Sequence, residues 1–364
     1  MRDILEEVAG WHAEGTRFAL ATVVRTWKSS PRQPGASMAV AETGEAVGSV
    51  SGGCVEGAVY ELAQEVLQTG VPAKQAYGIQ DDDAFAVGLT CGGILEIFVE
   101  PVDVPRYPEL PDVLAAVRGQ HGLAVATVVE GPGDVGHRIV VGADTLSGSL
   151  GSADLDHSVA GIARGMLEHG TTGVVHVGEN GEQRMDQLTV FVESFAPAPQ
   201  MIVFGAIDFA GAVVRAGKFL GYRVTLCDAR PVFATAKRFP DADEVVVDWP
   251  HRYLAGRDVD ERTVLCVLTH DPKFDVPLLE LALRSKAGYI GAMGSRRTHE
   301  DRLTRLREIG MDEQSLSRLS SPIGLDIGAR TPEETAVSIV AEIIALASGG
   351  SGRRLSETGT AIHR

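Results

Sequence analysis

The sequence predicts an α/β protein, in which an N-terminal α/β domain with an internal repeat precedes a C-terminal Rossmann-like, doubly wound parallel sheet. Three observations support this class. The first half of the chain holds two similar copies of one pattern, residues from 201 onward alternate between apolar strands and helices, and a Pro- and Ala-rich stretch (APAPQ, 196–200) separates the halves. We therefore predict domains at 1–195 and 200–348 and a flexible Gly/Ser-rich tail at 349–364.

The composition excludes several classes of protein. A net charge of −16 disfavours a nucleic-acid partner, because phosphate backbones are bound by clustered Lys and Arg. The acidic, amphipathic N-terminus is not a secretory signal, and the most apolar stretch, 336–347, is too short for a membrane span. Four cysteines without a signal peptide indicate free thiols in a reducing compartment, so we expect a cytoplasmic protein.

The N-terminal domain consists of two predicted copies, at about 18–100 and 123–194. FALATVV (18–24) resembles LAVATVV (123–129), and ILEIFVE (94–100) resembles LTVFVES (188–194). Between these strands, residues 48–70 align on 148–170 without a gap and with six identities. Each copy is expected to form a strand, a hairpin, a helix and closing strands.

The differences between the copies indicate which residues serve a function, because residues that both copies share are explained by their common fold. Cys54 stands opposite Asp154, and Cys91 has no cysteine counterpart. The loop from Arg25 to Ser37 is longer in the first copy and contains Arg32, a candidate for binding a phosphate. We therefore assign any chemistry to the first copy.

Cys54 follows Gly52 and Gly53 at the start of a predicted helix whose apolar face includes Val59 and Val66. The free N–H groups and the dipole of a helix N-terminus favour a thiolate, the form that binds metals or attacks sulfur. The glycines let a ligand approach the backbone. The alternative is a small buried cysteine beside a tight turn, since free cysteines are usually inert.

Cys91 lies next to Gly92 and Gly93, just before an apolar strand. The two Gly-flanked thiols could ligate a metal, exchange sulfur or only pack. Zinc ranks last among these, because no further Cys or His stands at the short spacing that a zinc site requires.

The C-terminal domain opens with the strand 201–204, a turn at Gly205, a helix and a second strand that ends at Asp228, a pattern typical of dinucleotide-binding folds. Gly205 and Asp228 are therefore cofactor-binding candidates, with Asp228 placed to accept hydrogen bonds from a ribose. Ile207 stands where a second glycine normally lets the backbone approach the pyrophosphate, and Asp208 adds a negative charge there. NAD(P) binding is doubtful for this reason.

A second candidate anion site follows a later strand, where Ser295, Arg296 and Arg297 combine a helix start with two guanidinium groups. His270 ends another strand, where a structural role is favoured. Cys227 and Cys266 lie inside apolar strands and are expected to pack. Thr331 to Glu334 predicts a capping box.

The run SPRQPGASMAVAETGEAVGSVSGGCVEG, with GLTCGG after it, resembles the N-terminal signature of the xanthine dehydrogenase accessory factor (XdhC/CoxI) family. The C-terminal domain resembles the same family, although Gly-Ala-Ile-Asp replaces its common Gly-Ala-Gly-His. The resemblance implies a chaperone that binds molybdenum cofactor (molybdopterin), protects it during sulfuration and delivers it to a molybdenum hydroxylase apoenzyme of the xanthine or CO dehydrogenase type. Cys54 and Cys91 match the family's cysteine positions.

This resemblance makes Cys54 the candidate molybdenum ligand, through the cofactor, and Cys91 its catalytic partner in sulfur transfer. A cysteine desulfurase is a further candidate partner, and a symmetric homodimer is expected on general grounds. Two other functions stay open: an NAD(P)-dependent oxidoreductase, suggested by the Rossmann pattern, and a non-catalytic adaptor whose cysteines only pack.

Overall fold

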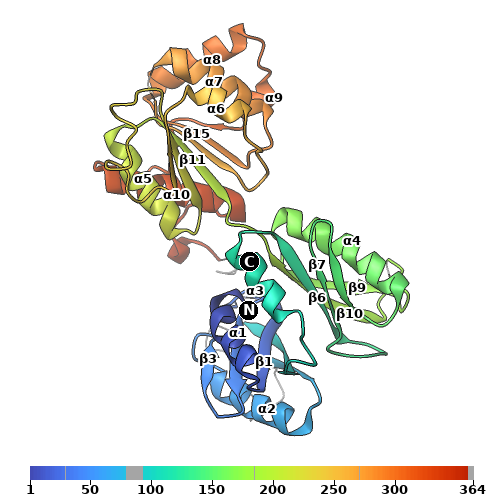
Figure 1. Ribbon diagram of the computed structural model, residues 1–364. Coiled ribbons are helices and arrows are strands. Elements are labelled where there is room, and N and C mark those ends of the chain that lie inside the picture. The colour runs from blue at the N-terminus through green and yellow to red at the C-terminus, as the bar shows by residue number, and fades with distance from the viewer. Residues whose placement is uncertain (29, 79–92, 184, 270, 360–364) are drawn as a thin grey trace. The chain divides into compact units, whose positions relative to one another are not determined.

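The computed structural model describes residues 1–28, 30–78, 93–183, 185–269 and 271–359. These residues form two compact units, Met1–Pro197 together with Gly359 (unit 1) and Ala198–Thr358 (unit 2). Both mix helices and strands, which confirms the predicted α/β class (Figure 1). Within the described residues, no helix combines the length and the apolar character that crossing a bilayer requires.

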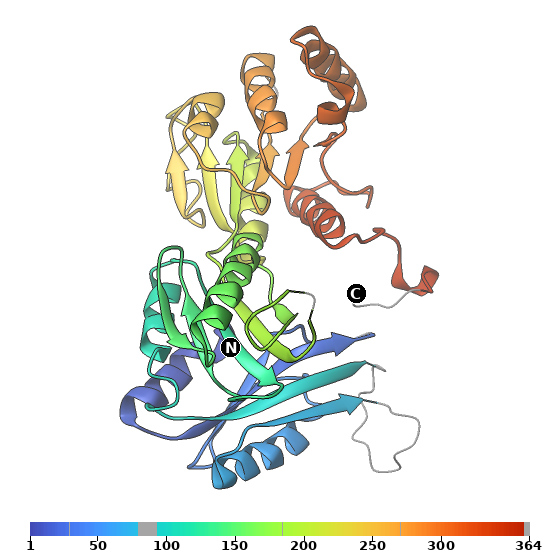
Figure 2. The same ribbon diagram turned by 90° about the vertical axis from the view of Figure 1, so that its right-hand side faces the viewer.

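The first sheet of unit 1 is antiparallel and has the strand order β3-β2-β1-β5-β4. Its strands are β1 (Phe18–Trp27), β2 (Ser37–Ala41), β3 (Ala46–Gly48), β4 (Ala73–Gly78) and β5 (Ile94–Val102). Helix α2 (Glu56–Thr69) covers one face, as Figure 2 shows, and buries Val59 and Val66 against the sheet as the sequence predicts. η1 (Arg2–Ile4) and α1 (Leu5–Glu14) precede β1.

The second sheet repeats this topology with the order β8-β7-β6-β10-β9. Its strands are β6 (Leu123–Glu130), β7 (Arg138–Val141), β8 (Leu146–Ser149), β9 (Gly173–Val177) and β10 (Leu188–Phe195). Helix α4 (Ala153–His169) covers one face and is the counterpart of α2, while α3 (Leu110–Arg118) joins the two halves of unit 1.

Strand register shows which residues of the two copies are equivalent. Phe98 lies opposite Thr22 and Phe191 lies opposite Thr127, so the two phenylalanines occupy the same place. Aligning ILEIFVE with LTVFVES from their first residues, as the sequence suggests, pairs Phe98 with Val192 instead and is wrong by one residue. The two phenylalanines pack together in one buried cluster between the sheets, so the copies meet through equivalent surfaces.

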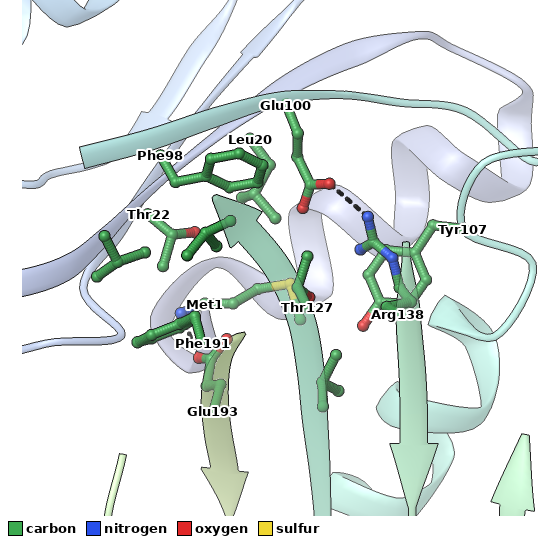
Figure 3. Close-up of a pocket in the computed structure, with 13 residues that line it drawn as sticks. Met1, Leu20, Thr22, Phe98, Glu100, Tyr107, Thr127, Arg138, Phe191 and Glu193 are labelled. Carbon is green, nitrogen blue, oxygen red and sulfur yellow. Dashed lines mark hydrogen bonds and ion pairs between the residues drawn. The ribbon is translucent and has the colours of Figure 1, made fainter. Parts of the chain in front are cut away.

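Two glutamates, Glu100 and Glu193, lie two residues beyond these phenylalanines and line a small pocket between the sheets (Figure 3). Glu100 pairs with the buried Arg138, whose guanidinium stacks 4.0 Å from the centre of the Tyr107 ring. Glu193 instead pairs with the α-amino group of Met1 at 2.7 Å. Equivalent carboxylates are thus neutralised by different cations.

Unit 2 contains a parallel sheet with the order β13-β12-β11-β14-β15-β16, which is the Rossmann strand order and confirms the predicted fold. The strands are β11 (Gln200–Phe204), β12 (Arg223–Cys227), β13 (Glu244–Val246), β14 (Val264–Val267), β15 (Tyr289–Ala292) and β16 (Leu319–Ser320). Strands β11, β12 and β14 are almost fully buried runs, because helices cover both faces.

Two helices, α5 (Asp208–Phe219) and α10 (Pro332–Ser348), pack on one face of this sheet (Figure 1). The other face carries α6 (Pro250–Ala255), α7 (Pro272–Arg284), α8 (Arg296–Glu308) and α9 (Glu313–Leu316). The capping box predicted at Thr331 and Glu334 is confirmed at the start of α10. A short helix, η2 (Leu355–Glu357), follows α10.

Candidate functional site

Cys54 lies in a loop that leads into α2, and two glycines shape this loop. Gly52 and Gly53 have φ values of 76° and 114°, which side chains other than glycine rarely tolerate. A Cβ atom at either position would meet nothing within 4 Å. The backbone conformation therefore requires glycine, and the backbone before the half-buried Cys54 faces open space.

Glu56 organises this loop from within. Its carboxylate accepts hydrogen bonds from the Ser49 hydroxyl at 2.6 Å and from the backbone N–H groups of Ser51 at 2.9 Å and Gly53 at 2.8 Å. Burial alone would raise the pKa of Glu56, but these bonds and that of the Ser51 hydroxyl lower it to about 2. The loop therefore carries a fixed negative charge.

In the second copy an acidic side chain also binds the loop before the helix, but the helix begins earlier. Asp156 stands in the place of Glu56 and accepts from the Ser149 hydroxyl at 2.9 Å and the Leu150 N–H at 2.6 Å. However, α4 already begins at Ala153, capped by Ser152, whereas α2 begins only at Glu56. Almost one helical turn of the first copy is therefore unwound, and Cys54 lies in the unwound segment.

The surroundings of Cys54 differ from those that the sequence predicts. We expected its thiol to profit from free N–H groups at the helix N-terminus. Instead the N–H groups of Gly53 and Val55 bind Glu56, and that of Cys54 binds the Ser51 hydroxyl at 2.9 Å. The physical reason is that a carboxylate within the same loop satisfies the donors first. Two features distinguish Cys54 from Asp154 in the second copy: the open space at Gly52 and Gly53, and the unwound turn before α2.

Sequence reasoning missed Glu56 because it looked for functional residues only where the two copies differ. The signal lies in what they share: Ser49 and Ser149 are identical, and Glu56 and Asp156 are both acidic. Cys91, Gly92 and His270 lie outside the described residues. Gly93 is buried directly before β5. Within the described ranges no three His, Cys, Asp or Glu side chains gather as a metal site would need.

Arg32 lines a cavity of about 410 Å³ in unit 1, together with Arg2, which sequence reasoning also missed. Arg2 donates to the Ala196 carbonyl at 2.8 Å and lies over the Phe195 ring. Arg32 forms no hydrogen bond or ion pair with any of the residues that the structure describes.

In unit 2, Gly205 lies between β11 and the end of β14. Its φ of +110° requires glycine, and an added Cβ would lie 3.0 Å from the Thr269 backbone nitrogen. Asp228 directly follows β12, and its carboxylate accepts from the Ala206 N–H at 2.7 Å and the Arg230 N–H at 2.8 Å. Two further bonds come from the Arg230 guanidinium, at 2.9 and 2.7 Å.

The carboxylate of Asp228 therefore connects the turn at Gly205 to the loop after β12. It accepts four hydrogen bonds from the protein itself, so a ligand is not required to satisfy it. Burial opposes the ionised form, yet these bonds hold the pKa of Asp228 below its usual range. The adjacent crevice, of about 450 Å³, is lined by Ile207, Arg230, Lys273 and Phe274 among others. Ile207 thus occupies the wall where a dinucleotide would need close backbone approach.

Ser295 caps α8 by accepting a hydrogen bond from the Thr298 N–H at 3.1 Å. Arg296 and Arg297 are exposed and form no ion pair within the described part of the chain. On the same helix, the buried Arg302 pairs with Asp275 at 3.0 Å and donates to the Met293 carbonyl at 2.9 Å. This buried network holds the strand end in place.

Cys227 and Cys266 are fully buried in β12 and β14, as predicted. Burial raises the pKa of each thiol to about 12, so neither thiolate forms at neutral pH.

Two family models match this chain, and together they cover more than half of it. The model of the XdhC and CoxI family matches residues 11–78 and 116–178, one stretch in each copy of unit 1. The model of the XdhC Rossmann domain matches residues 201–343. The chain belongs to the XdhC and CoxI family.

Relatives of this family member align over most of its length. A probable xanthine dehydrogenase subunit of Bacillus subtilis (strain 168) is 29% identical over 89% of this chain and 92% of its own. The molybdenum cofactor insertion chaperone PaoD of Escherichia coli (strain K12) is 26% identical over 90% of this chain and 83% of its own. A crystal structure described as a xanthine dehydrogenase of Bacillus halodurans has a TM-score of 0.70 and 28% identity, covering 98% of this chain and 97% of that one.

Proposed function

We propose that this XdhC/CoxI family member binds molybdenum cofactor as a cargo in the cytoplasm and delivers it to a molybdenum hydroxylase apoenzyme. Two relatives support the proposal, one named as a cofactor insertion chaperone and one as part of a probable xanthine dehydrogenase. The E. coli relative matches over 90% of this chain, so the likeness extends to both units.

The unwound turn before α2 is the observation that carries the proposal. Sulfur donors suit a molybdenum centre. The first copy holds such a donor, Cys54, next to two glycines with open space above their backbone. The half-buried Cys54 also packs against the apolar core of this copy. At the equivalent position the second copy winds Asp154 into a helix and offers no thiol. Among the described residues at this place, the first copy therefore supplies a thiol and the second does not.

The finer steps belong to the same proposal. Cys91 relays sulfur or provides a second ligand, and a cysteine desulfurase supplies the sulfur. Ser295, Arg296 and Arg297 are the candidates in unit 2 for binding an anion. We also propose a homodimer, since symmetric pairs are the commonest assemblies.

The test is a titration of the purified full chain with molybdopterin cofactor released anaerobically from a molybdoenzyme, followed by gel filtration and molybdenum analysis. We expect the wild type to retain molybdenum, Cys54→Ala to lose it, and the matched variant Asp154→Ala in the second copy to retain it. If the wild type retains none where a known cofactor-binding protein does, the carrier function fails and the adaptor takes its place.

An NAD(P)-dependent oxidoreductase is the second candidate, because the Rossmann strand order favours it. Two features disfavour it: the Asp228 carboxylate already accepts hydrogen bonds from protein donors, and the Ile207 side chain lines the crevice where the nucleotide would bind. We expect no change in melting temperature on addition of NAD(H) or NADP(H). A saturable rise of several degrees with either nucleotide would restore this candidate.

A further inference from the structure

Unit 1 contains two cavities that are lined by equivalent segments of its two copies. Ser37 pairs with Thr22 and Arg138 pairs with Thr127, so Ser37 and Arg138 occupy equivalent places. Each starts the second strand of its copy, just after a glycine turn. The hairpins that lead into these strands, 33–37 and 134–138, therefore correspond.

Each hairpin meets the glutamate of the other copy. A Cβ on Gly35 would lie 3.7 Å from Glu193 Oε1, and a Cβ on Gly136 would lie 3.6 Å from Glu100 Oε2. The hairpin of the first copy and Glu193 line the cavity of about 410 Å³, which we call the first-copy cavity. The hairpin of the second copy and Glu100 line its counterpart of about 350 Å³, the second-copy cavity.

The basic side chains of the second-copy cavity all have acidic partners. These pairs are Arg138 with Glu100, Arg106 with Asp103, and His137 with Asp134. These acidic partners compensate the basic side chains of the second-copy cavity. We therefore expect this cavity to attract no anionic ligand.

The first-copy cavity differs in its charge. Glu193 is already neutralised by the α-amino group of Met1, which also donates to the Gly35 carbonyl. Arg2 and Arg32 both line the cavity, and Asp3 is the one remaining carboxylate among its described lining residues. Arg32 comes from the loop that is longer in the first copy, and no carboxylate of the described residues pairs with it. Arg32 thus places a half-buried positive charge in this cavity that no described carboxylate compensates.

We propose that the first-copy cavity binds a phosphate group, free or at the end of a small ligand. A guanidinium matches the geometry of phosphate oxygens through two parallel hydrogen bonds, and a second arginine adds charge. The volume exceeds that of one phosphate and is within the range of small-molecule sites. The proposal does not depend on the molybdenum cargo, whose phosphate is one of the two sources of such a group.

The test uses inorganic phosphate and pyrophosphate, titrated into the full chain at constant ionic strength and followed by phosphorus NMR. We compare the wild type with Arg32→Ala, Arg32→Lys and Arg106→Ala, the last being the matched control in the second-copy cavity. Loss of Arg32 is expected to raise the Kd about tenfold, as for loss of a charged hydrogen bond. Arg32→Lys should retain part of the affinity, and Arg106→Ala should match the wild type.

Two results would overturn the proposal: no saturable binding by the wild type up to tens of millimolar, or equal weakening by Arg32→Ala and Arg106→Ala. Displacement of retained molybdenum cofactor by phosphate would identify the cargo as the source of the phosphate. Phosphate binding that leaves the cofactor in place would indicate free phosphate or another ligand. If no cofactor is retained but phosphate still binds through Arg32, the proposed function fails while this site stands.

Discussion

At the scale of single residues, Glu56 shows how one carboxylate can define a loop. Its pKa is lowered from 4.5 to about 2, so the folded state favours the ionised form. The resulting stability is present above pH 4.5 and is lost as the pH falls towards 2. Because Glu56 is partly exposed to solvent, screening reduces the contribution to the order of 1–2 kcal/mol.

We therefore expect Glu56→Gln to lower the free energy of unfolding by about 1–2 kcal/mol at pH 7, and the difference from the wild type to shrink between pH 4.5 and 2. Urea unfolding at several pH values measures this. Asp156→Asn is the matched change in the second copy. A difference that stays constant across the whole pH range would contradict the role given to the Glu56 charge.

Gly205 provides a second prediction, about crowding. Gly205 and Gly221 both have positive φ, but only a Cβ at Gly205 meets the Thr269 backbone, at 3.0 Å. Gly205→Ala should destabilise unit 2 by about 2–4 kcal/mol, and Gly221→Ala by about 1 kcal/mol. Urea unfolding of both variants separates backbone strain from crowding. Equal losses would mean that the close approach to Thr269 is of no consequence.

At the scale of elements, the start of α2 is the feature that separates the copies. The double variant Gly52→Ser with Gly53→Ala gives the first copy the residues of the second at these two positions, where Ser152 caps a helix that begins at Ala153. We expect α2 to wind back by about one turn, Cys54 to shift, and cofactor retention to fall at least tenfold with little change in melting temperature.

The reverse exchange, Ser152→Gly with Ala153→Gly, is the control for this variant. It should cost about 1 kcal/mol, because glycine weakens a helix start, and should leave cofactor retention unchanged. Gel filtration with molybdenum analysis reads out retention, and circular dichroism reads out helix content. If the variant with the rewound α2 retains the cofactor fully, the unwound turn has no role in binding the cargo.

The elements themselves were largely predictable from the sequence. Apolar runs located the central strands of both units, among them β1, β5, β6, β10 and β11, and the repeat predicted two similar sheets. The exposed β8 has no apolar run to reveal it. Side-chain contacts were less predictable. The Rossmann pattern predicted the position of Asp228. It did not predict that the Arg230 guanidinium donates two hydrogen bonds to the Asp228 carboxylate, because this depends on how the chain turns after β12. The pairing of Glu193 with Met1 joins residues that are 192 positions apart, which no local pattern can indicate.

At the scale of the whole molecule, unit 1 is held together by surfaces that its two copies share. Phe98 and Phe191 pack together at the centre, and the carboxylates of Glu100 and Glu193 flank them. Apolar burial stabilises this contact without distinguishing the copies, whereas the charges distinguish them. Only the second copy has an arginine, Arg138, at the place where the first has Ser37.

This asymmetry makes Arg138 a sensitive position. Arg138 and Glu100 have side chains only 6% and 8% exposed, so Arg138→Ala leaves a buried carboxylate without its cation. We expect a loss of about 3–5 kcal/mol in urea unfolding. Glu100→Gln combined with Arg138→Met should recover much of this loss, because no unpaired charge then stays buried. Arg118→Ala removes an exposed ion pair with Glu6 and should change little. If the double variant is as unstable as Arg138→Ala, stacking on Tyr107 and packing between the copies, more than charge, account for the role of Arg138.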